Sequence, residues 1–359
     1  MAFVLSACVV LIPSPEPGLG KEKTPPATVP VKVLILDDSD DDFQTAPFED
    51  AVVLLTATGH VAHRIGGLNV CETIGGCRAI MASLDGRSLI VCENVADRIT
   101  AYEIGTGNPL WSLPGEFTAA VVHGDTVYAL KADGSVYGKE IMAIDSQGDV
   151  LRQADLGGSD IAVDPHGNVL WLVGENIKKC DTSFNVLWHT DPIQWCASSV
   201  DVVPDGSAWV AERAHVQTGG TNRLLHIAPD GTIASTIPVD MSPTCVRVDP
   251  SDKSVWVSGI RIQNNRKLCV TMRNWPDIIG YRDDYQISGR PICKYSMQGQ
   301  LLWRSNDGGE SLDFDPSDGS VWIGGQTKVW HCSRDGVELH TYDCLSSGQK
   351  WICIVPPDR

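Results

Sequence analysis

The sequence has few basic residues and no long apolar run. Its 28 Lys and Arg stand against 45 Asp and Glu, which gives a formal charge of -17 at pH 7. No block of Lys and Arg interrupts this acidic background. A nucleic-acid partner and docking on an anionic membrane surface are therefore not expected, because each needs clustered basic side chains. No stretch of about 18 apolar residues occurs, so no transmembrane span is predicted.

Motifs that carry well-known chemistry are also missing. None of the twelve cysteines belongs to a CxxC or CxxCH motif, which argues against zinc knuckles, thioredoxin-type redox sites and c-type haem. There is no GxSxG motif and the nine His occur singly, so the sequence gives no support for nucleophilic catalysis. The scattered cysteines fit either disulfides, with Cys71–Cys77 and Cys269–Cys293 as candidates, or small buried hydrophobic residues.

The N-terminus, MAFVLSACVVLIPSP, is apolar and contains a stretch, LSAC, that fits the lipobox of bacterial lipoproteins. In such proteins the cysteine is lipidated, so Cys8 is the candidate lipidation site and residues 1–12 the remnant of a signal. A usable signal peptide needs a basic start and a longer apolar run, and a chance apolar start is the alternative. Residues 13–30 form a Pro-rich linker of the kind that precedes an exported domain. We expect an extracytoplasmic protein (periplasmic, in the cell envelope or secreted) that contacts a membrane only through such a lipid anchor.

The rest of the chain is dominated by an internal repeat. One unit consists of a short strand, an Asp/Gly turn and a second strand with an aromatic residue. The clearest copies are IAVDPHGNVLWLVGEN, VDVVPDGSAWVAER, VRVDPSDKSVWVSG and LDFDPSDGSVWIGG, and weaker ones are IMASLDGRSLIVCEN and AAVVHGDTVYALKAD. The aromatic residues at matching places are Trp171, Trp209, Trp256, Trp322 and Tyr128.

A second kind of hairpin accompanies these units. Its turns fall at Gly59, Gly107, Gly148, Asn185, Gly231, Gly299 and Gly336. Short β-branched runs between Gly and Asp turns predict hairpins, and four strands every 40 or so residues are typical of β-propeller blades. We predict an all-β fold, a seven-bladed β-propeller with six or eight blades as alternatives, formed by residues 31–359 as a single domain. The first hairpin lacks an inner pair, which residues 31–38 and 350–357 can supply, so both ends of this domain should close one blade.

Several of these units resemble known propeller repeats. DPSDGSVWIGG with its following hairpin resembles the NHL, YVTN and virginiamycin-B-lyase-like repeats of bacterial propellers. AYEIGTGNPLWSL and QGQLLWRS are similar to the PQQ-like repeat, in which a Trp ends the outer strand. The resemblance covers about residues 50–355 and implies architecture, not activity. It does not imply a calcium-bound quinone, because the adjacent cysteine pair of the quinone enzymes is absent.

Candidate binding residues follow from the strand order. We name the strands of a blade a to d from the centre outward, so that the b–c and d–a connections share one face, the usual ligand face of a propeller. In calcium-dependent lactonase-type propellers a Glu, two Asn and an Asp converge on one metal in the channel. The residues here that could be recruited to that task are Glu116, Asp160, Glu310, Asn94 and Asn176. No cofactor is required by the sequence, and calcium is the one that could be held.

A long connection marks the same face. Residues 261–291 extend one b–c connection, and long loops in compact domains are often functional. The loop carries residue types enriched at binding hot spots. The candidate ligand-binding residues are Arg273, Trp275, Tyr281 and Tyr285 in this insertion and Arg78, Glu116, Asp160 and Glu310 at the ends of inner strands. A lid that shields the blade edge is the alternative interpretation of the insertion.

Charged residues also occur on the predicted inner strands. Asp201 and Asp313 flank Arg247 at matching places in neighbouring blades. We predict a structural network of ion pairs, in which the partners offset the cost of burial, with a charged ligand patch inside the channel as the alternative.

These observations favour binding over catalysis. We expect a monomeric binding or scaffold module that recognises a protein or small-molecule ligand on the channel-mouth face with the insertion. The alternative is an enzyme, a metal-dependent (calcium) hydrolase or lactonase or a lyase, that uses channel carboxylates.

Overall fold

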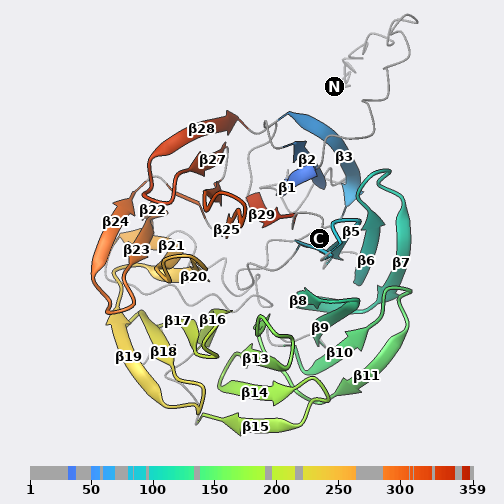
Figure 1. Ribbon diagram of the computed structural model, residues 1–359, viewed down its shortest axis with the longest axis horizontal. Helices are drawn as coiled ribbons and strands as arrows, with labels where there is room; N and C mark the ends of the chain where they lie inside the picture. Colours follow the sequence, from blue (N-terminus) through green and yellow to red (C-terminus); the bar gives the residue numbers. More distant parts are fainter. Residues whose placement is uncertain are drawn as a thin grey trace, which may run out of the picture.

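Seven antiparallel sheets stand around a central axis in the computed structural model (Figure 1). The structure describes residues 31–37, 50–56, 60–68, 80–83, 85–93, 97–132, 138–190, 196–214, 221–263, 286–306, 308–309, 311–325, 328–343 and 350–355. In these residues all regular elements are strands, and each sheet has four main strands. The prediction of an all-β, seven-bladed propeller is confirmed.

We number the blades from the one that holds β1. Blade 1 contains β29 (Lys350–Ile354), β1 (Val31–Asp37), β2 (Asp50–Thr56) and β3 (Val61–Leu68). Blade 2 contains β4 (Ile80–Ala82), β5 (Ser88–Glu93), β6 (Arg98–Glu103) and β7 (Pro109–Pro114). Blade 3 contains β8 (Glu116–His123), β9 (Thr126–Ala132), β10 (Glu140–Ile144) and β11 (Val150–Ala154). Blade 4 contains β12 (Asp160–Val163), β13 (Val169–Val173), β14 (Ile177–Asp181) and β15 (Val186–His189).

The remaining blades follow the same order. Blade 5 contains β16 (Cys196–Val202), β17 (Ala208–Arg213), β18 (Arg223–Ile227) and β19 (Ile233–Pro238). Blade 6 contains β20 (Ser242–Val248), β21 (Val255–Gln263), β23 (Ile292–Tyr295) and β24 (Leu301–Ser305), and a further strand, β22 (Gln286–Gly289), pairs with β21. Blade 7 contains β25 (Ser311–Phe314), β26 (Val321–Gly324), β27 (Lys328–Cys332) and β28 (Glu338–Asp343).

Blade 1 combines strands from opposite ends of the domain, as predicted. β29 is the innermost strand and pairs with β1 in antiparallel register from Val33↔Ile354 to Asp37↔Lys350. Ile352 and Ile354 are buried in the same hydrophobic cluster as Val33 and Ile35. This pairing joins the two ends and closes the ring.

One row of paired residues recurs across the blades and explains the repeated aromatic residues. In each sheet it lies just before the bulge between strands c and d. From strand a to strand d it contains Cys353, Leu34, Leu54 and His63 in blade 1; Met81, Ile90, Ala101 and Trp111 in blade 2; Val121, Tyr128, Ala143 and Arg152 in blade 3; and Ala162, Trp171, Lys179 and Trp188 in blade 4. In blades 5 to 7 it contains Asp201, Trp209, His226 and Ser235; Arg247, Trp256, Lys294 and Trp303; and Asp313, Trp322, His331 and His340. Directly paired residues face the same side of a sheet, so the four side chains of each row lie on one face of their blade. We call it the cross-strand row.

The strand-b tryptophans of this row are the largest fully buried side chains among the described residues, and each is covered by its strand-c neighbour. The Lys179 ammonium lies 5.1 Å from the ring centroid of Trp171, and Lys294 lies 5.4 Å from that of Trp256. In the alternate blades His226 stacks on Trp209 and His331 stacks on Trp322. Both arrangements place a polar nitrogen-bearing group against an aromatic face, and for lysine this is a cation–π contact.

The outer end of the row joins neighbouring blades. The indole of Trp303 lies against the c–d turn of blade 7 at Gly336, and that of Trp111 lies in the same way against Gly148 of blade 3. Both glycines have positive φ, 80° and 88° respectively. A side chain there would be strained and would also overlap the indole, so only glycine suits both demands.

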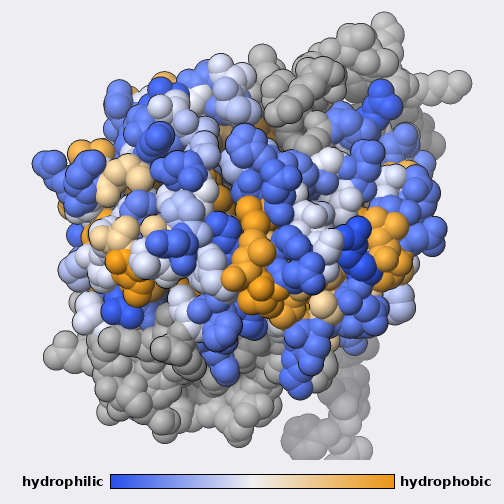
Figure 2. Space-filling view, turned by 60° about the horizontal axis from the view of Figure 1, so that its bottom comes forward, coloured by the Kyte–Doolittle hydropathy of each residue, from blue (hydrophilic) through white to orange (hydrophobic). Residues whose placement is uncertain are grey.

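Exposed aliphatic side chains also recur, at the outer strands close to the c–d turns. They are Val61, Leu110, Val150, Leu151, Val186, Leu187, Ile233, Leu301, Leu302, Val337 and Leu339. On the side drawn in Figure 2 the apolar patches are separated by hydrophilic side chains. Each blade thus contributes its own small patch, and scattered apolar side chains of this kind need no partner.

Candidate functional site

The predicted site residue Asp160 is fully buried at the start of β12, where it joins two blades. Its Oδ1 accepts a hydrogen bond from the backbone N–H of Ile161 at 2.9 Å. Its Oδ2 accepts one from the N–H of Val200, on the inner strand of the next blade, at 3.0 Å. An inner strand has no strand partner on its channel side, so such N–H groups need other acceptors. The carboxylate of Asp160 supplies one.

The same link recurs around the channel. Asp201 Oδ2 accepts from Val248 N at 2.8 Å, which connects blade 5 to blade 6. Asp313 Oδ2 accepts from Ile354 N at 2.8 Å, which connects blade 7 to β29 of blade 1. Inner-strand carboxylates are therefore part of the scaffold that holds the blades together.

Arg247 occupies the position in blade 6 that Asp201 and Asp313 occupy in blades 5 and 7, and it is buried. Its Nη1 donates to the carbonyl of Val246 at 2.9 Å. Burial raises the pKa of the Asp313 carboxyl above its ordinary value, the charge of Arg247 opposes this rise, and the charge of Asp201 adds to it. Arg247 and Asp201 thus both act on the Asp313 carboxyl, and the network of ion pairs among the three residues stays a prediction.

Glutamates at the ends of strands b are held by the strands that follow them. Glu93 is fully buried and accepts from Arg98 Nε and Nη2 at 2.9 and 2.7 Å, from Thr100 at 2.7 Å and from Tyr102 at 2.8 Å. Burial opposes ionisation of Glu93, but these hydrogen bonds outweigh it, and the pKa of the carboxyl lies below its ordinary value. Glu212 of blade 5 makes the matching ion pair with Arg223. In both blades an Arg that begins strand c was the sequence signal for this role.

The lowered pKa of Glu93 predicts an acid-dependent loss of stability. A carboxyl with a lowered folded-state pKa contributes stability above its unfolded value, near the ordinary 4.5, and that contribution is lost as the pH falls through the folded-state value. Glu93→Gln should lower the free energy of unfolding by about 2 kcal/mol at pH 7, because bonds to a charged acceptor are lost. The deficit should shrink below pH 4.5. Urea denaturation across this range measures it, with Glu103→Gln on the exposed end of β6 as control; a pH-independent deficit would contradict the assignment.

The other residues of the predicted metal and ligand sets are only partly placed. Glu116 begins β8 and is half-buried, and Asn176 lies in the turn between β13 and β14. The rest lie outside the described residues: Arg78, Asn94, Glu310, Arg273, Trp275, Tyr281, Tyr285 and the lipidation candidate Cys8. Within the part of the chain that the structure describes, no group of three or more His, Cys, Asp or Glu could hold a metal ion. Calcium binding stays a prediction.

Three charged side chains form a cluster at the base of the insertion. Asp240, between β19 and β20, accepts from Arg261 Nη2 at 2.9 Å and from Arg304 Nη2 at 3.1 and 2.9 Å. The three side chains keep 56%, 29% and 28% of their surface exposed, respectively. Within the part of the chain that the structure describes, two guanidinium groups share one carboxylate here, so the cluster has a local excess of positive charge. Sequence reasoning missed it because its members come from three different strand ends.

Four buried cysteines are free thiols. They are Cys92, Cys180, Cys293 and Cys332. Since Cys293 is free, the candidate disulfide Cys269–Cys293 is wrong, whereas Cys71 and Cys77 lie outside the described residues. Burial raises the pKa of Cys92 and Cys180 to about 12, which keeps these thiols protonated and unreactive at neutral pH. They serve as small hydrophobic core residues.

None of the described residues belongs to a helix that could span a membrane.

Comparison with known proteins identifies a fold. No family model and no curated protein matches the sequence. Many chains of known structure are similar, among them hydrazine synthase of Kuenenia stuttgartiensis, with a TM-score of 0.59 and 15% identity over 74% of this chain and 78% of that one. At this identity the likeness extends to architecture alone, and the resemblance to NHL, YVTN and PQQ-like repeats stays a prediction. The chain is a seven-bladed β-propeller.

Proposed function

We propose that the protein is a binding module that recognises a protein partner on the face where the b–c and d–a connections emerge. The observation that carries this proposal is the charge cluster of Asp240, Arg261 and Arg304 at the base of the insertion. β21 and β22 continue their pairing from Arg261↔Gly289 to Gln263↔Gln286, which is beyond the pairing of β21 with β23. The cluster thus stands where a hairpin extends from the ring.

The chemistry of the cluster fits recognition of an acidic surface. Arg is enriched at binding hot spots, and its planar guanidinium pairs well with carboxylates. Arg261 also contacts Asn306 through Nη1 at 3.4 Å, so it is held by residues of two d–a connections. A carboxylate-bearing partner would find two partly exposed guanidinium groups that, among the described residues, share the one counter-charge of Asp240.

The inner-strand acids support binding more than metal-dependent hydrolysis. Asp160, Asp201 and Asp313 each accept a backbone N–H of a neighbouring blade. A metal ion would have to compete with these links. The extracytoplasmic location that we propose rests on the N-terminal LSAC stretch.

The experiment compares three full-length variants. In the first a short Gly-Ser linker replaces residues 264–285, in the second Arg261→Glu and Arg304→Glu reverse the cluster, and in the control glycines replace residues 133–137 in the b–c connection of blade 3. A partner is first captured from an extract of the source organism, then purified, and its affinity is measured by calorimetry. We expect at least a tenfold loss of affinity for the first two variants and none for the control. Equal binding by all three would overturn the proposal.

A further inference from the structure

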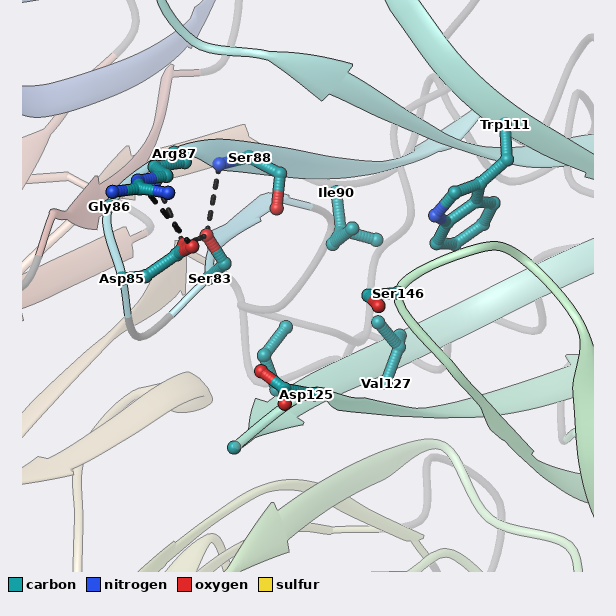
Figure 3. A pocket seen from close by; sticks show the side chains of 12 residues that line it. Ser83, Asp85, Gly86, Arg87, Ser88, Ile90, Trp111, Asp125, Val127 and Ser146 are labelled. Carbon is teal, nitrogen blue, oxygen red and sulfur yellow. Dashed lines mark hydrogen bonds and ion pairs between the residues drawn. The ribbon is translucent and has the colours of Figure 1, made fainter.

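A cleft of about 760 Å³ opens between blades 2 and 3, on the face of the a–b and c–d turns (Figure 3). This face is opposite to the one with the insertion. The cleft is lined by the a–b turns of both blades, by Trp111 of β7 and by the c–d turn of blade 3. Its size lies within the roughly 300–1,000 Å³ that small-ligand sites occupy.

At the cleft, blade 2 carries smaller side chains in the cross-strand row than blade 4 does. Its strands b and c carry Ile90 and Ala101 where blade 4 has Trp171 and Lys179. In blade 4 the Lys179 ammonium crosses to the next blade and donates to the carbonyl of Pro229 at 2.9 Å. Lys294 of blade 6 makes the matching bond to the carbonyl of Arg334 at 2.9 Å. The short side chain of Ala101 cannot reach the next blade, and the space stays open.

The walls of the cleft combine an apolar floor with a polar rim. Ile90 and Val127 lie at the floor with the indole of Trp111, as Figure 3 shows. The rim carries Asp85 and Arg87 on one side and Asp125 on the other.

The rim is ordered on the blade 2 side. Asp85 Oδ1 accepts from Ser83 Oγ at 2.5 Å and from Arg87 N at 3.0 Å. The guanidinium of Arg87 lies 3.9 Å from Asp85 Oδ2 and is largely exposed. A carboxylate acceptor held by its own turn and an exposed guanidinium donor therefore stand side by side at the mouth.

We propose that this cleft binds a short neutral oligosaccharide. A sugar ring presents an apolar C–H face, which packs on an aromatic ring, and hydroxyl groups, which both donate and accept. The indole of Trp111 and the rim groups supply these two kinds of contact. An anionic ligand would meet Asp85 and Asp125 on a protein of formal charge -17, and a cation would leave the donors of Arg87 without an acceptor on the ligand. A neutral, hydroxyl-rich ligand suits acceptors and donors alike.

The test measures binding of maltotriose, cellotriose and N,N′,N″-triacetylchitotriose to the full chain by calorimetry and by saturation-transfer NMR. We expect at least one of the three to bind. The double substitution Ile90→Trp and Ala101→Lys restores the row of blade 4 and should fill the cleft, which would weaken binding at least tenfold. Leu110→Ala is the matched control, because Leu110 is next to Trp111 but is exposed and does not line the cleft.

A second variant tests the proposal even if the double substitution prevents folding. Asp125→Ala changes an exposed turn residue of the rim and should weaken binding of the same trisaccharide at least threefold while the thermal midpoint stays unchanged. Failure of all three trisaccharides to bind overturns the proposal, as does binding that the double substitution leaves intact. Tetramethylammonium or acetate binding in the cleft in place of sugar would overturn the ligand class. Replacement of residues 264–285 should leave sugar binding intact, which separates this proposal from that for the opposite face.

Discussion

Removal of β29 by ending the chain at residue 349 should abolish the cooperative unfolding transition. β29 is the inner strand of blade 1, and its pairing with β1 is what closes the ring. Its N–H groups at Ile352 and Ile354 also bond to Ser311 Oγ and Asp313 Oδ2 of blade 7 at 2.8 Å each. Without it the ring opens between two blades and the buried edge of β1 meets water, which propeller closure otherwise prevents. Circular dichroism during heating should show no sharp transition.

A fragment experiment provides the control for this truncation. A peptide of residues 345–359 added to the truncated chain should restore a cooperative transition, because the missing strand is supplied in trans. The same peptide with Ile352→Asp should not, since Ile352 is buried. A truncated chain that melts cooperatively within about 5 °C of the full protein would contradict closure by β29.

Gly336→Ala should lower the free energy of unfolding by about 3 kcal/mol, the sum of an overlap in a packed site and of strain at positive φ. Gly336 has φ of 80°, and a Cβ there would overlap the indole of Trp303 of the neighbouring blade. The indole cannot move aside easily, because it also packs on Trp256, with ring centroids 5.3 Å apart. Urea denaturation measures the effect.

Gly124→Ala is the matched control for this substitution. Gly124 also lies in a turn with positive φ, 58°, but a Cβ there would meet nothing within 4 Å. It should cost about 1 kcal/mol through backbone strain alone. Equal losses for the two variants would show that the contact between blades adds nothing beyond the turn.

The ring was predictable because its determinants are local. Trp171, Trp209, Trp256 and Trp322 recur in short units with their turns, and a strand period of two then fixes the face they occupy. The closure of blade 1 followed from a hairpin that lacked inner partners. Each of these features can be recognised within a short stretch of the sequence.

The roles of the acids could not be predicted in the same way. Asp160 and Val200, whose backbone N–H donates to it, are 40 residues apart and meet only because adjacent blades lie side by side. The residue type fits a ligand site and a structural link equally well. The cleft likewise depends on two side chains that are too short to fill the space between the blades, those of Ile90 and Ala101, which are paired across strands. The weak repeat copy IMASLDGRSLIVCEN, which lacks a Trp, was the available signal.

The measurement that tests the account most directly is the stability of Asp160→Ala in calcium and in EDTA. If Asp160 links blades 4 and 5, the variant should lose about 2 kcal/mol of unfolding free energy, by the same amount in both solutions. The opposite result has two parts: calcium stabilises the unchanged protein, and the substitution removes that stabilisation, so that the loss appears only with calcium. Asp160 would then be a metal ligand. That result would contradict a binding module built on a scaffold of inner-strand carboxylates and would favour a metal-dependent enzyme.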